Sequence, residues 1–446
     1  MSVPVHSPSV IPPRRGVCPG LSRPLSTGDG LLVRILPIGT IALDAFAALC
    51  ALARTYGNGI IEITARGSIQ VRGLSADSAP RFADAVAALG IAAEDGVPIL
   101  CNPLAGLDAA EIFDASAFAA ALRYAVAQQS FASRLDPKVS IVIDGGAPLG
   151  LARVAADIRL RAQLRNGQPM LRLGIGGDEA SAADLGVIAP GDGVEAISRL
   201  LHVLAGRGAR ARDIIAAEGA TCFVHALACA HRGSVARRDH GVSSIETGGA
   251  APRQCRDPIG LHALRDGSLA CGIGLAFGHA EARTLEKFAG AAAATGARGL
   301  RSAPNRRLLA IGLTSQSAAR LLATAAKTGF ITLADDPRRH VVACAGAPLC
   351  ASAYIAARAI APDIAAAAAP YLSDGPTIHV SGCAKGCAHP GAAPLTVVGT
   401  KEDCGLIANG SARDAPFATA PLRELPDVIA DHLRECCSLA EKIRHV

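Results

Sequence analysis

Four cysteines near the C-terminus combine a residue type and a spacing that could do chemistry. Cys344 and Cys350 stand in CAGAPLC with five residues between them, and Cys383 and Cys387 stand in SGCAKGCAHPG with three between them. Four thiolates are what a cubane iron–sulfur cluster requires, one for each iron. Glycines flank the second pair, and they would let the backbone approach the inorganic sulfides and donate N–H groups to them.

Two other interpretations of these cysteines stay open. A structural zinc site is the first, although zinc-binding pairs usually have two to four residues between the cysteines, and a gap of five is unusual. Ordinary buried thiols are the second, although paired spacing in glycine-rich loops is not typical of them. The chain has 14 cysteines in 446 residues. A long chain without a secretion signal favours reduced thiols and a metal site over disulfides.

Composition bounds the architecture and the partners. The length is enough for about two to four domains with well-filled cores. Half of the residues are hydrophobic, but aromatic residues make up only 3% and tryptophan is absent. The cores must therefore be built from Leu, Val, Ile and Ala. The net charge of +6 suits an anionic small molecule. No basic helix interleaved with aromatic residues indicates a nucleic-acid partner.

We expect neither an export signal nor a membrane span in this chain. No stretch of 18 residues is apolar and free of charge, so we expect no membrane span. The first 20 residues are rich in proline and lack the apolar core of a secretory signal, so residues 1–20 are predicted to be a flexible arm. A cytoplasmic protein is the simplest interpretation.

Two segments look like diverged copies of one unit. Residues 30–74 and 268–313 each read as a strand, a helix of about four turns and two short strands. Gly57 and Gly59 are placed to end the first helix, and Gly296 to end the second. Similar length and the same order of elements indicate a duplication, and two such halves could pair into one module of sheets and helices.

A longer α/β segment follows each copy. Residues 90–250 contain the strand-like KVSIVIDGG and QPMLRLGIGG, and residues 330–430 contain the four cysteines and the strand-like PLTVVG. The chain therefore alternates half-domain, α/β segment, half-domain, α/β segment.

The cysteine pattern resembles that of the sulfite/nitrite reductase superfamily. The resemblance implies that the four cysteines hold a 4Fe–4S cluster, and that in sirohaem members the cysteine matching Cys387 also bridges to the haem iron. It implies an α/β (α+β) fold with a pseudo-twofold axis, made of two ferredoxin-like half-domains and two α/β cofactor-binding domains. The half-domains are expected over residues 21–88 and 257–328, and the α/β domains over residues 89–250 and 329–446.

Sirohaem reductases hold their oxyanion with two arginines and two lysines, and this chain keeps only half of that set. Arg66 in TARGSIQVRG and Lys138 in LDPKVSIVID match one residue of each kind. The second arginine position falls at or beside Val97, and the second lysine position is Ser140. Each missing cation would weaken the hold on an oxyanion that gains charge during reduction.

More specific motifs resemble the precorrin-3B synthase family, a branch of the same superfamily. These are RGVCPGLSRPLSTGDGLLVRI, CNPLAGLD, LDPK and HVSGCAKGCAHPG, which span residues 15–390. The resemblance implies an O2-dependent monooxygenase that hydroxylates precorrin-3A and closes a lactone in aerobic cobalamin (vitamin B12) biosynthesis. It implies a 4Fe–4S cluster and a mononuclear non-haem iron, without sirohaem. His379 and His389 flank the second cysteine pair and could bind that iron or move protons.

A reduced tetrapyrrole carries many carboxylates, so we expect several cations around its rim. The candidates are Arg66, Arg72, Lys138, Arg301 and Arg306. One departure from the family lies in APNRR at residues 303–307, where a TPWR-like stretch is expected and Asn305 replaces the tryptophan. No convincing dinucleotide-binding fingerprint is present, so electrons from NADH would arrive through a separate donor protein.

Three hypotheses follow from the sequence. The leading one is the precorrin-3A monooxygenase. The second is a sirohaem-dependent sulfite or nitrite reductase, against which Val97 and Ser140 speak. The third is a non-enzymatic protein that contains a cluster or zinc and only binds a tetrapyrrole, against which the retained basic residues and the duplicated scaffold speak.

Overall fold

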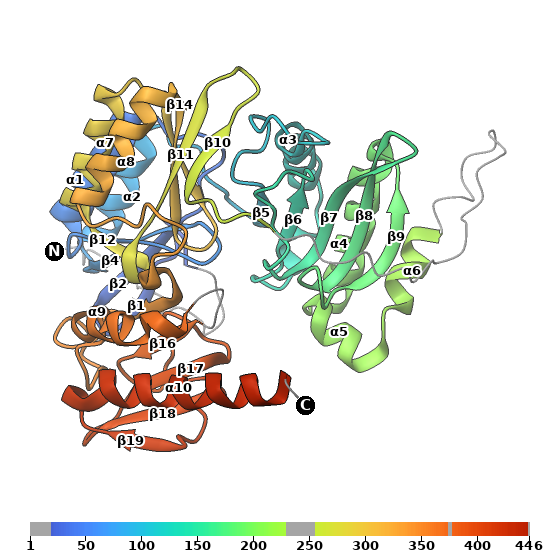
Figure 1. Ribbon diagram of the computed structural model, residues 1–446. Coiled ribbons are helices and arrows are strands. Elements are labelled where there is room, and N and C mark those ends of the chain that lie inside the picture. Colours follow the sequence, from blue (N-terminus) through green and yellow to red (C-terminus); the bar gives the residue numbers. More distant parts are fainter. Residues whose placement is uncertain (1–18, 229–254, 373–376, 445–446) are drawn as a thin grey trace, which may run out of the picture.

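The computed structural model describes residues 19–228, 255–372 and 377–444 (Figure 1). Most of the predicted arm at residues 1–20 and the end of the segment at residues 89–250 therefore lie outside the described residues. The described chain forms four sheets. In two of them the strand order is the one expected of half-domains, and the other two are mixed sheets in α/β domains.

The first half-domain is a sheet covered by two helices. Its elements are β1 (Leu25–Thr27), β2 (Gly30–Ile35), α1 (Leu43–Tyr56), β3 (Ile60–Ile63), β4 (Ile69–Leu74) and α2 (Ser78–Ala88). In α1 the buried residues Phe46, Leu49, Cys50 and Ala53 recur every three to four positions, as one face of a helix requires. The helix ends at Gly57, as predicted.

The second half-domain repeats this order. Its elements are β10 (Gly260–Ala263), β11 (Leu269–Gly274), β12 (His279–Glu281), α7 (Ala282–Ala294), β13 (Gly299–Ala303), β14 (Arg307–Leu313) and α8 (Ser315–Lys327). The strand order β10-β11-β14-β13 matches β1-β2-β4-β3 of the first half. Each half also has a first strand and a second helix that lie outside the repeat seen in the sequence.

The two half-domains exchange backbone hydrogen bonds. Strand β12 of the second half pairs antiparallel with β3 of the first half. The reciprocal contact joins Ile41 and Leu300, whose amides donate to each other's carbonyl oxygens at 2.8 and 2.9 Å. Helices α1 and α7 pack together inside one hydrophobic core that contains buried residues of both halves. The pseudo-twofold fold class that we predicted is confirmed.

The first α/β domain has five strands in chain order. They are β5 (Ile99–Cys101), β6 (Ile141–Asp144), β7 (Ala156–Arg165), β8 (Gln168–Gly177) and β9 (Ala183–Ile188), and the helices are α3 (Ala115–Ala127), α4 (Gly193–Arg207), α5 (Ala211–Glu218) and α6 (Thr221–Ala228). The first three strands are parallel, and β8 and β9 return antiparallel.

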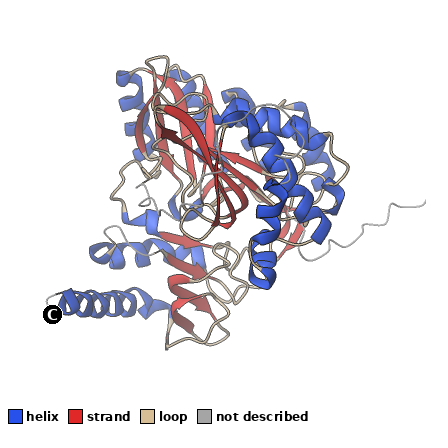
Figure 2. Ribbon diagram, turned by 90° about the vertical axis from the view of Figure 1, so that its right-hand side faces the viewer, coloured by secondary structure: helices blue, strands red, loops and turns tan. Residues whose placement is uncertain are grey.

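The second α/β domain copies that sheet. Its elements are β15 (Val341–Ala343), α9 (Ala357–Ala368), β16 (Ile378–Ser381), β17 (Ala393–Gly399), β18 (Cys404–Gly410), β19 (Ala418–Ala420) and α10 (Leu425–Arg444). Again three parallel strands are followed by two antiparallel ones. Figures 1 and 2 both show α10 as a long helix lying along this domain. None of the described helices is long and apolar enough to cross a membrane.

The shared core predicts a matched pair of substitutions. Leu285 on α7 is fully buried in this core, whereas Leu261 on β10 is 48% exposed. Leu285→Ala should lower the free energy of unfolding by about 2–5 kcal/mol, because it removes buried methyl groups and leaves a cavity. Leu261→Ala should change it by less than about 0.5 kcal/mol. Urea denaturation of both variants measures the difference, and equal effects would contradict the shared core.

Candidate functional site

The four cysteines of the predicted cluster lie in two loops at one edge of the second α/β sheet. Cys344 follows β15 directly, and Cys383 comes two residues after β16. These strands are parallel neighbours, so their carboxyl ends lie side by side. The Gly382 amide donates to the sulfur of Cys344 at 3.0 Å, which joins the two loops. All four cysteines are free thiols.

Two glycines leave space for the sulfur atoms of Cys344 and Cys350, because glycine has no side chain. A Cβ atom on Gly382 would lie 3.4 Å from the Cys344 sulfur and 2.7 Å from the Ala353 side chain. A Cβ atom on Gly28, in the β1–β2 turn of the first half-domain, would lie only 2.4 Å from the Cys350 sulfur. The Ala351 amide also donates to the Gly28 carbonyl at 2.9 Å. The cysteine loops are therefore packed against the first half-domain.

The thiols affect one another's ionisation. Burial raises the pKa of Cys344, the amides of Gly382 and Gly346 lower it, and the neighbouring Cys383 and Cys350 raise it. Cys387 is affected in the same direction, by partial burial and then by Cys344, while Arg72 opposes the shift. The thiolate forms of Cys344 and Cys387 are therefore disfavoured unless bound cations stabilise them. This donor set suits an iron–sulfur cluster.

The described residues do not bring three ligands together around a single metal ion. In the part of the chain that the structure describes, no three His, Cys, Asp or Glu side chains converge as ligands of one ion. A cubane cluster needs a different arrangement of ligands, because each of its four thiolates binds a different iron atom. A cluster therefore stays the prediction for the two cysteine loops, and zinc stays the less favoured alternative.

Arg72, a predicted substrate ligand, lies behind the cysteine loops and is already paired. Its Nε and Nη2 donate to the two carboxylate oxygens of Asp29 at 2.7 Å each, and Glu62 lies 3.5 Å away. Arg358 forms an ion pair with the same Glu62. The charge of Arg72 acts on Cys387, whose thiolate it favours.

Arg66 and Arg306 lie on two hairpin turns that touch each other. The β3–β4 turn carries Arg66 and the β13–β14 turn carries Arg306, and the Asn305 amide donates to the Ala65 carbonyl at 3.0 Å. Arg66 donates through Nη1 to the Ala155 carbonyl of the first α/β domain at 2.5 Å. Arg306 instead contacts the second α/β domain, where its Nη2 donates to the Ala388 carbonyl at 3.3 Å.

The local backbone holds Arg306 in place. Its φ of 68° is left-handed, and a Cβ atom on Gly278 would lie 2.8 Å from its Cδ, so the side chain crosses a glycine. Burial lowers the pKa of Arg306 to about 10, with help from Arg307. No carboxylate among the described residues forms an ion pair with it. Glu62 opposes this lowering of the pKa, but a partly buried cation without an ion pair still favours an anionic ligand.

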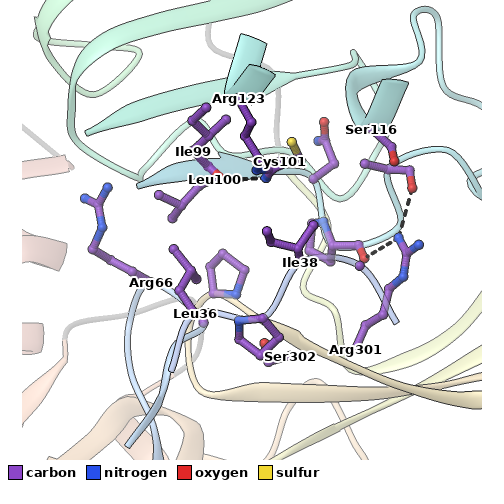
Figure 3. Close-up of a pocket in the computed structure, with 17 residues that line it drawn as sticks. Leu36, Ile38, Arg66, Ile99, Leu100, Cys101, Ser116, Arg123, Arg301 and Ser302 are labelled. Carbon is purple, nitrogen blue, oxygen red and sulfur yellow. Dashed lines mark hydrogen bonds between the residues drawn. The ribbon is translucent and has the colours of Figure 1, made fainter. Parts of the chain in front are cut away.

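Arg301 lines a pocket between the first half-domain, the first α/β domain and β13, as Figure 3 shows. Arg66, Arg123 and Cys101 also line it. The Arg301 guanidinium donates to the Ala105 and Pro103 carbonyls at 2.9 and 3.3 Å, and Nε donates to the Thr40 hydroxyl at 2.9 Å. Arg66 and Arg301 stand on opposite sides of the pocket in Figure 3, so they do not converge on one point.

The remaining predicted residues are Lys138 and the two histidines that flank the second cysteine pair. Lys138 is exposed in the loop before β6, where its backbone amide donates to the Asp136 carboxylate at 2.8 Å. His379 is fully buried on β16, and neither ring nitrogen has a hydrogen-bond partner in the described structure. Its ring centroid lies 5.8 Å from that of His389. Burial, His389 and Arg306 together lower the pKa of His379 to about 4, so its imidazole is neutral.

The sequence analysis did not identify three residues that make notable contacts at the cysteine loops or at the equivalent loops of the first α/β domain. Glu62 and Arg358 pair across domains, and nothing in their local sequence indicates this. Asn102 is different, because it follows β5 as Cys344 follows β15, and its Oδ1 accepts from the Gly145 amide at 2.5 Å as Cys344 accepts from Gly382. An internal alignment of the two α/β segments could have identified it.

Comparisons with known proteins agree with this geometry. Residues 23–89 match the nitrite/sulfite reductase ferredoxin-like half domain. A precorrin-3B synthase from Sinorhizobium sp is 40% identical over 408 residues, which is 91% of this chain and 85% of that protein. The chain belongs to the precorrin-3B synthase family. The family resemblance stated from the cysteine loops and the other motifs is thereby confirmed.

More distant relatives outline the superfamily around precorrin-3B synthases. A ferredoxin–nitrite reductase from Synechococcus elongatus is 26% identical over 406 residues, covering 85% of this chain and 78% of that protein. The structure of the Mycobacterium tuberculosis NirA protein superposes with a TM-score of 0.70 at 18% identity, covering 91% of this chain and 80% of that one. This likeness supports the fold.

The geometry of the cysteine loops yields a direct test. Replacing Cys344, Cys350, Cys383 or Cys387 by Ser should remove most of the iron and acid-labile sulfide from the anaerobically purified protein, because an alkoxide is a poor substitute for a thiolate ligand. Cys437→Ser is the matched control, since this exposed cysteine lies on α10. Iron and sulfide per chain are measured. Full cluster content in all four variants would contradict the assignment.

Proposed function

We propose that this member of the precorrin-3B synthase family is an O2-dependent monooxygenase. It would hydroxylate precorrin-3A and close an acetate side chain into a lactone, in the cytoplasm and as a step of aerobic cobalamin biosynthesis. One atom of O2 enters the macrocycle, and the other leaves as water after taking up two electrons and two protons. The observation that carries the substrate assignment is the arrangement of Arg66 and Arg306.

These two arginines are spread apart and do not converge on a single point. They start from touching turns on the pseudo-twofold axis and reach opposite α/β domains. A carboxylate-rich macrocycle needs cations distributed around its rim, whereas a small oxyanion needs them directed at one position. Arg306 has no carboxylate partner among the described residues, and so its charge is available to a substrate carboxylate.

The other predicted substrate ligands differ in how well the structure supports a substrate contact. Arg301 lines the same pocket as Arg66, so it stays a candidate for a second carboxylate. Lys138 is exposed and stays a candidate at the rim. Arg72 is bound on both edges by Asp29 and Glu62, and we assign it to the electrostatics of the cysteine site instead of the substrate.

The cysteine loops would hold a 4Fe–4S cluster, which supplies electrons one at a time. The residues fit that group: four thiols at one sheet edge, an amide aimed at Cys344, and glycines where a side chain would strike sulfur. The electrons would come from NADH through a separate donor protein.

His379 and His389 are the side chains that would hold a mononuclear iron. Both nitrogens of the buried His379 are without a partner in the described structure. His389 uses Nε2 for the Ala392 carbonyl at 3.1 Å, which leaves Nδ1 able to bind a metal. Water or substrate would supply further ligands.

A sirohaem-dependent sulfite or nitrite reductase is the less favoured function. The position of its second lysine is Ser140, which is 5% exposed and whose amide is bonded to the Asp157 carboxylate at 2.9 Å. Val97, at or beside the second arginine position, packs against the core of the first α/β domain. Arg123 lines the nearby pocket, but it is paired with Glu94 at 2.6 Å.

The reaction itself is the decisive experiment for this function. Purified enzyme with precorrin-3A, a chemical reductant and isotopically labelled O2 should give a product that contains one labelled oxygen atom. Mass spectrometry of the product measures this incorporation. Sulfite and nitrite are supplied in parallel assays. Turnover of either anion without labelled tetrapyrrole would favour the reductase and overturn the proposal.

The arginines give a second prediction. Arg306→Gln and Arg66→Ala should each weaken tetrapyrrole binding by about 1.5–3 kcal/mol where the carboxylate contact is shielded from water, because a charge-assisted hydrogen bond is lost. Arg165→Ala is the control, since this arginine is exposed at the end of β7. Fluorescence titration with a stable carboxylated tetrapyrrole measures the affinity. Unchanged affinity in both variants, with cluster content intact, would show that the carboxylates bind elsewhere.

A further inference from the structure

Arg358 is a mostly buried cation beside the cysteine loops, and two of its hydrogen-bond donors have no partner among the described residues. It is the second residue of α9, and its side chain is 11% exposed. Nη2 donates to the carboxylate of Glu62. Nε and Nη1 are buried and have no hydrogen-bond partner in the described structure. Leaving a buried polar donor unpaired is unfavourable, and more so when the group is charged, so an acceptor is expected at this position.

The backbone places Arg358 next to the first cysteine loop. A Cβ atom on Gly346 would lie 2.5 Å from the Ala357 nitrogen, so the loop that begins at Cys344 is pressed against the start of α9. The Ala347 amide donates to the Ile355 carbonyl at 2.8 Å and closes the same contact. Arg358 lies within electrostatic reach of Cys344, since burial lowers the pKa of Arg358 while Glu62 and Cys344 act to raise it.

The acceptor that fits these donors is sulfur of a bound cluster. The carboxylates that act on Arg358 are Glu62, which already accepts from Nη2, and Asp29, which Arg72 occupies. Thiolate and inorganic sulfide atoms carry negative charge and accept N–H groups, and the cysteine loops would hold them at this side of α9.

We propose that Arg358 donates its Nε–H and Nη1–H groups to sulfur atoms of the 4Fe–4S cluster and thereby raises the reduction potential of that cluster. The inference rests on the proposed cluster. Reduction adds one negative charge to the cluster. A neighbouring cation and its hydrogen bonds stabilise the reduced form more than the oxidised form. Glu62, whose carboxylate binds the same guanidinium, acts in the opposite direction.

Arg358 and Glu62 carry opposite charges, so replacing each of them should shift the midpoint potential in opposite directions. Arg358→Gln removes the cation and should shift the midpoint potential to more negative values. Glu62→Gln removes the carboxylate and should shift it to more positive values. We expect at least a tenfold change in the reduction equilibrium for Arg358→Gln, which is 59 mV for a one-electron couple. Arg358→Lys keeps the charge but loses the fork of donors, so its potential should lie between those of the wild type and the Gln variant.

The measurement is a redox titration of the cluster-loaded, full-length chain, followed by electron paramagnetic resonance. Iron and sulfide content is determined first, so that a missing cluster in the wild type is recognised as failure of the cluster proposal and not of this one. Arg210→Gln is the matched control, because Arg210 forms a buried pair with Asp157 in the first α/β domain. Its potential should equal that of the wild type.

Each outcome decides the proposal. Shifts of opposite sign in the Arg358 and Glu62 variants support it. Shifts of the same sign, or a shift as large in Arg210→Gln, would show that general destabilisation moves the potential and would overturn it. If Arg358→Gln holds no cluster, Glu62→Gln carries the test, and an unchanged potential in that variant refutes the proposal.

Discussion

The parallel pairing of β15 with β16 is the constraint on which the cysteine site depends. Two cysteine pairs that are distant in sequence can meet only where the strands before them end at the same edge. The loops then need a backbone contact that fixes their separation, and the Gly382 amide bonded to the Cys344 sulfur supplies it. The β1–β2 turn closes the site from the first half-domain, where a side chain on Gly28 would collide with Cys350.

In the first α/β domain, the loops at the equivalent edge of the sheet are held together without the cluster cysteines. Asn102 and Gly145 occupy the register positions of Cys344 and Gly382, and their hydrogen bond repeats the contact of the cysteine loops. Asn102 also donates to Asp144 at 3.1 Å, and Asp144 accepts from the Gly146 amide. A closed network of buried hydrogen bonds holds these loops together, where the second domain has thiols suited to a cluster. The duplicated fold can therefore tolerate different chemistry at equivalent positions.

The sequence was informative where a local pattern carries the physics. Alternating half-domains and α/β segments, the C-terminal end of α1 at Gly57 and the strand at PLTVVG were all visible as periodicity and turn residues. The cysteine motifs identified the family. What could not be seen was which cations are already paired. Arg72 looked like a substrate ligand because nothing near it in sequence shows that Asp29, forty-three residues earlier, would meet its guanidinium at 2.7 Å.

Buried charge explains why the basic residues divide into two groups. Arg72 and Arg358 lie behind the cysteine loops with Asp29 and Glu62, so two cations balance two carboxylates at an inter-domain contact. Charges taken out of water must be paired in this way or find a ligand. Arg306 is partly buried, and among the described residues its guanidinium meets the Ala388 carbonyl within hydrogen-bond distance but forms no ion pair. The balanced pairs lie beside the cysteine loops, and in the proposed function an anionic substrate would compensate the charge of Arg306.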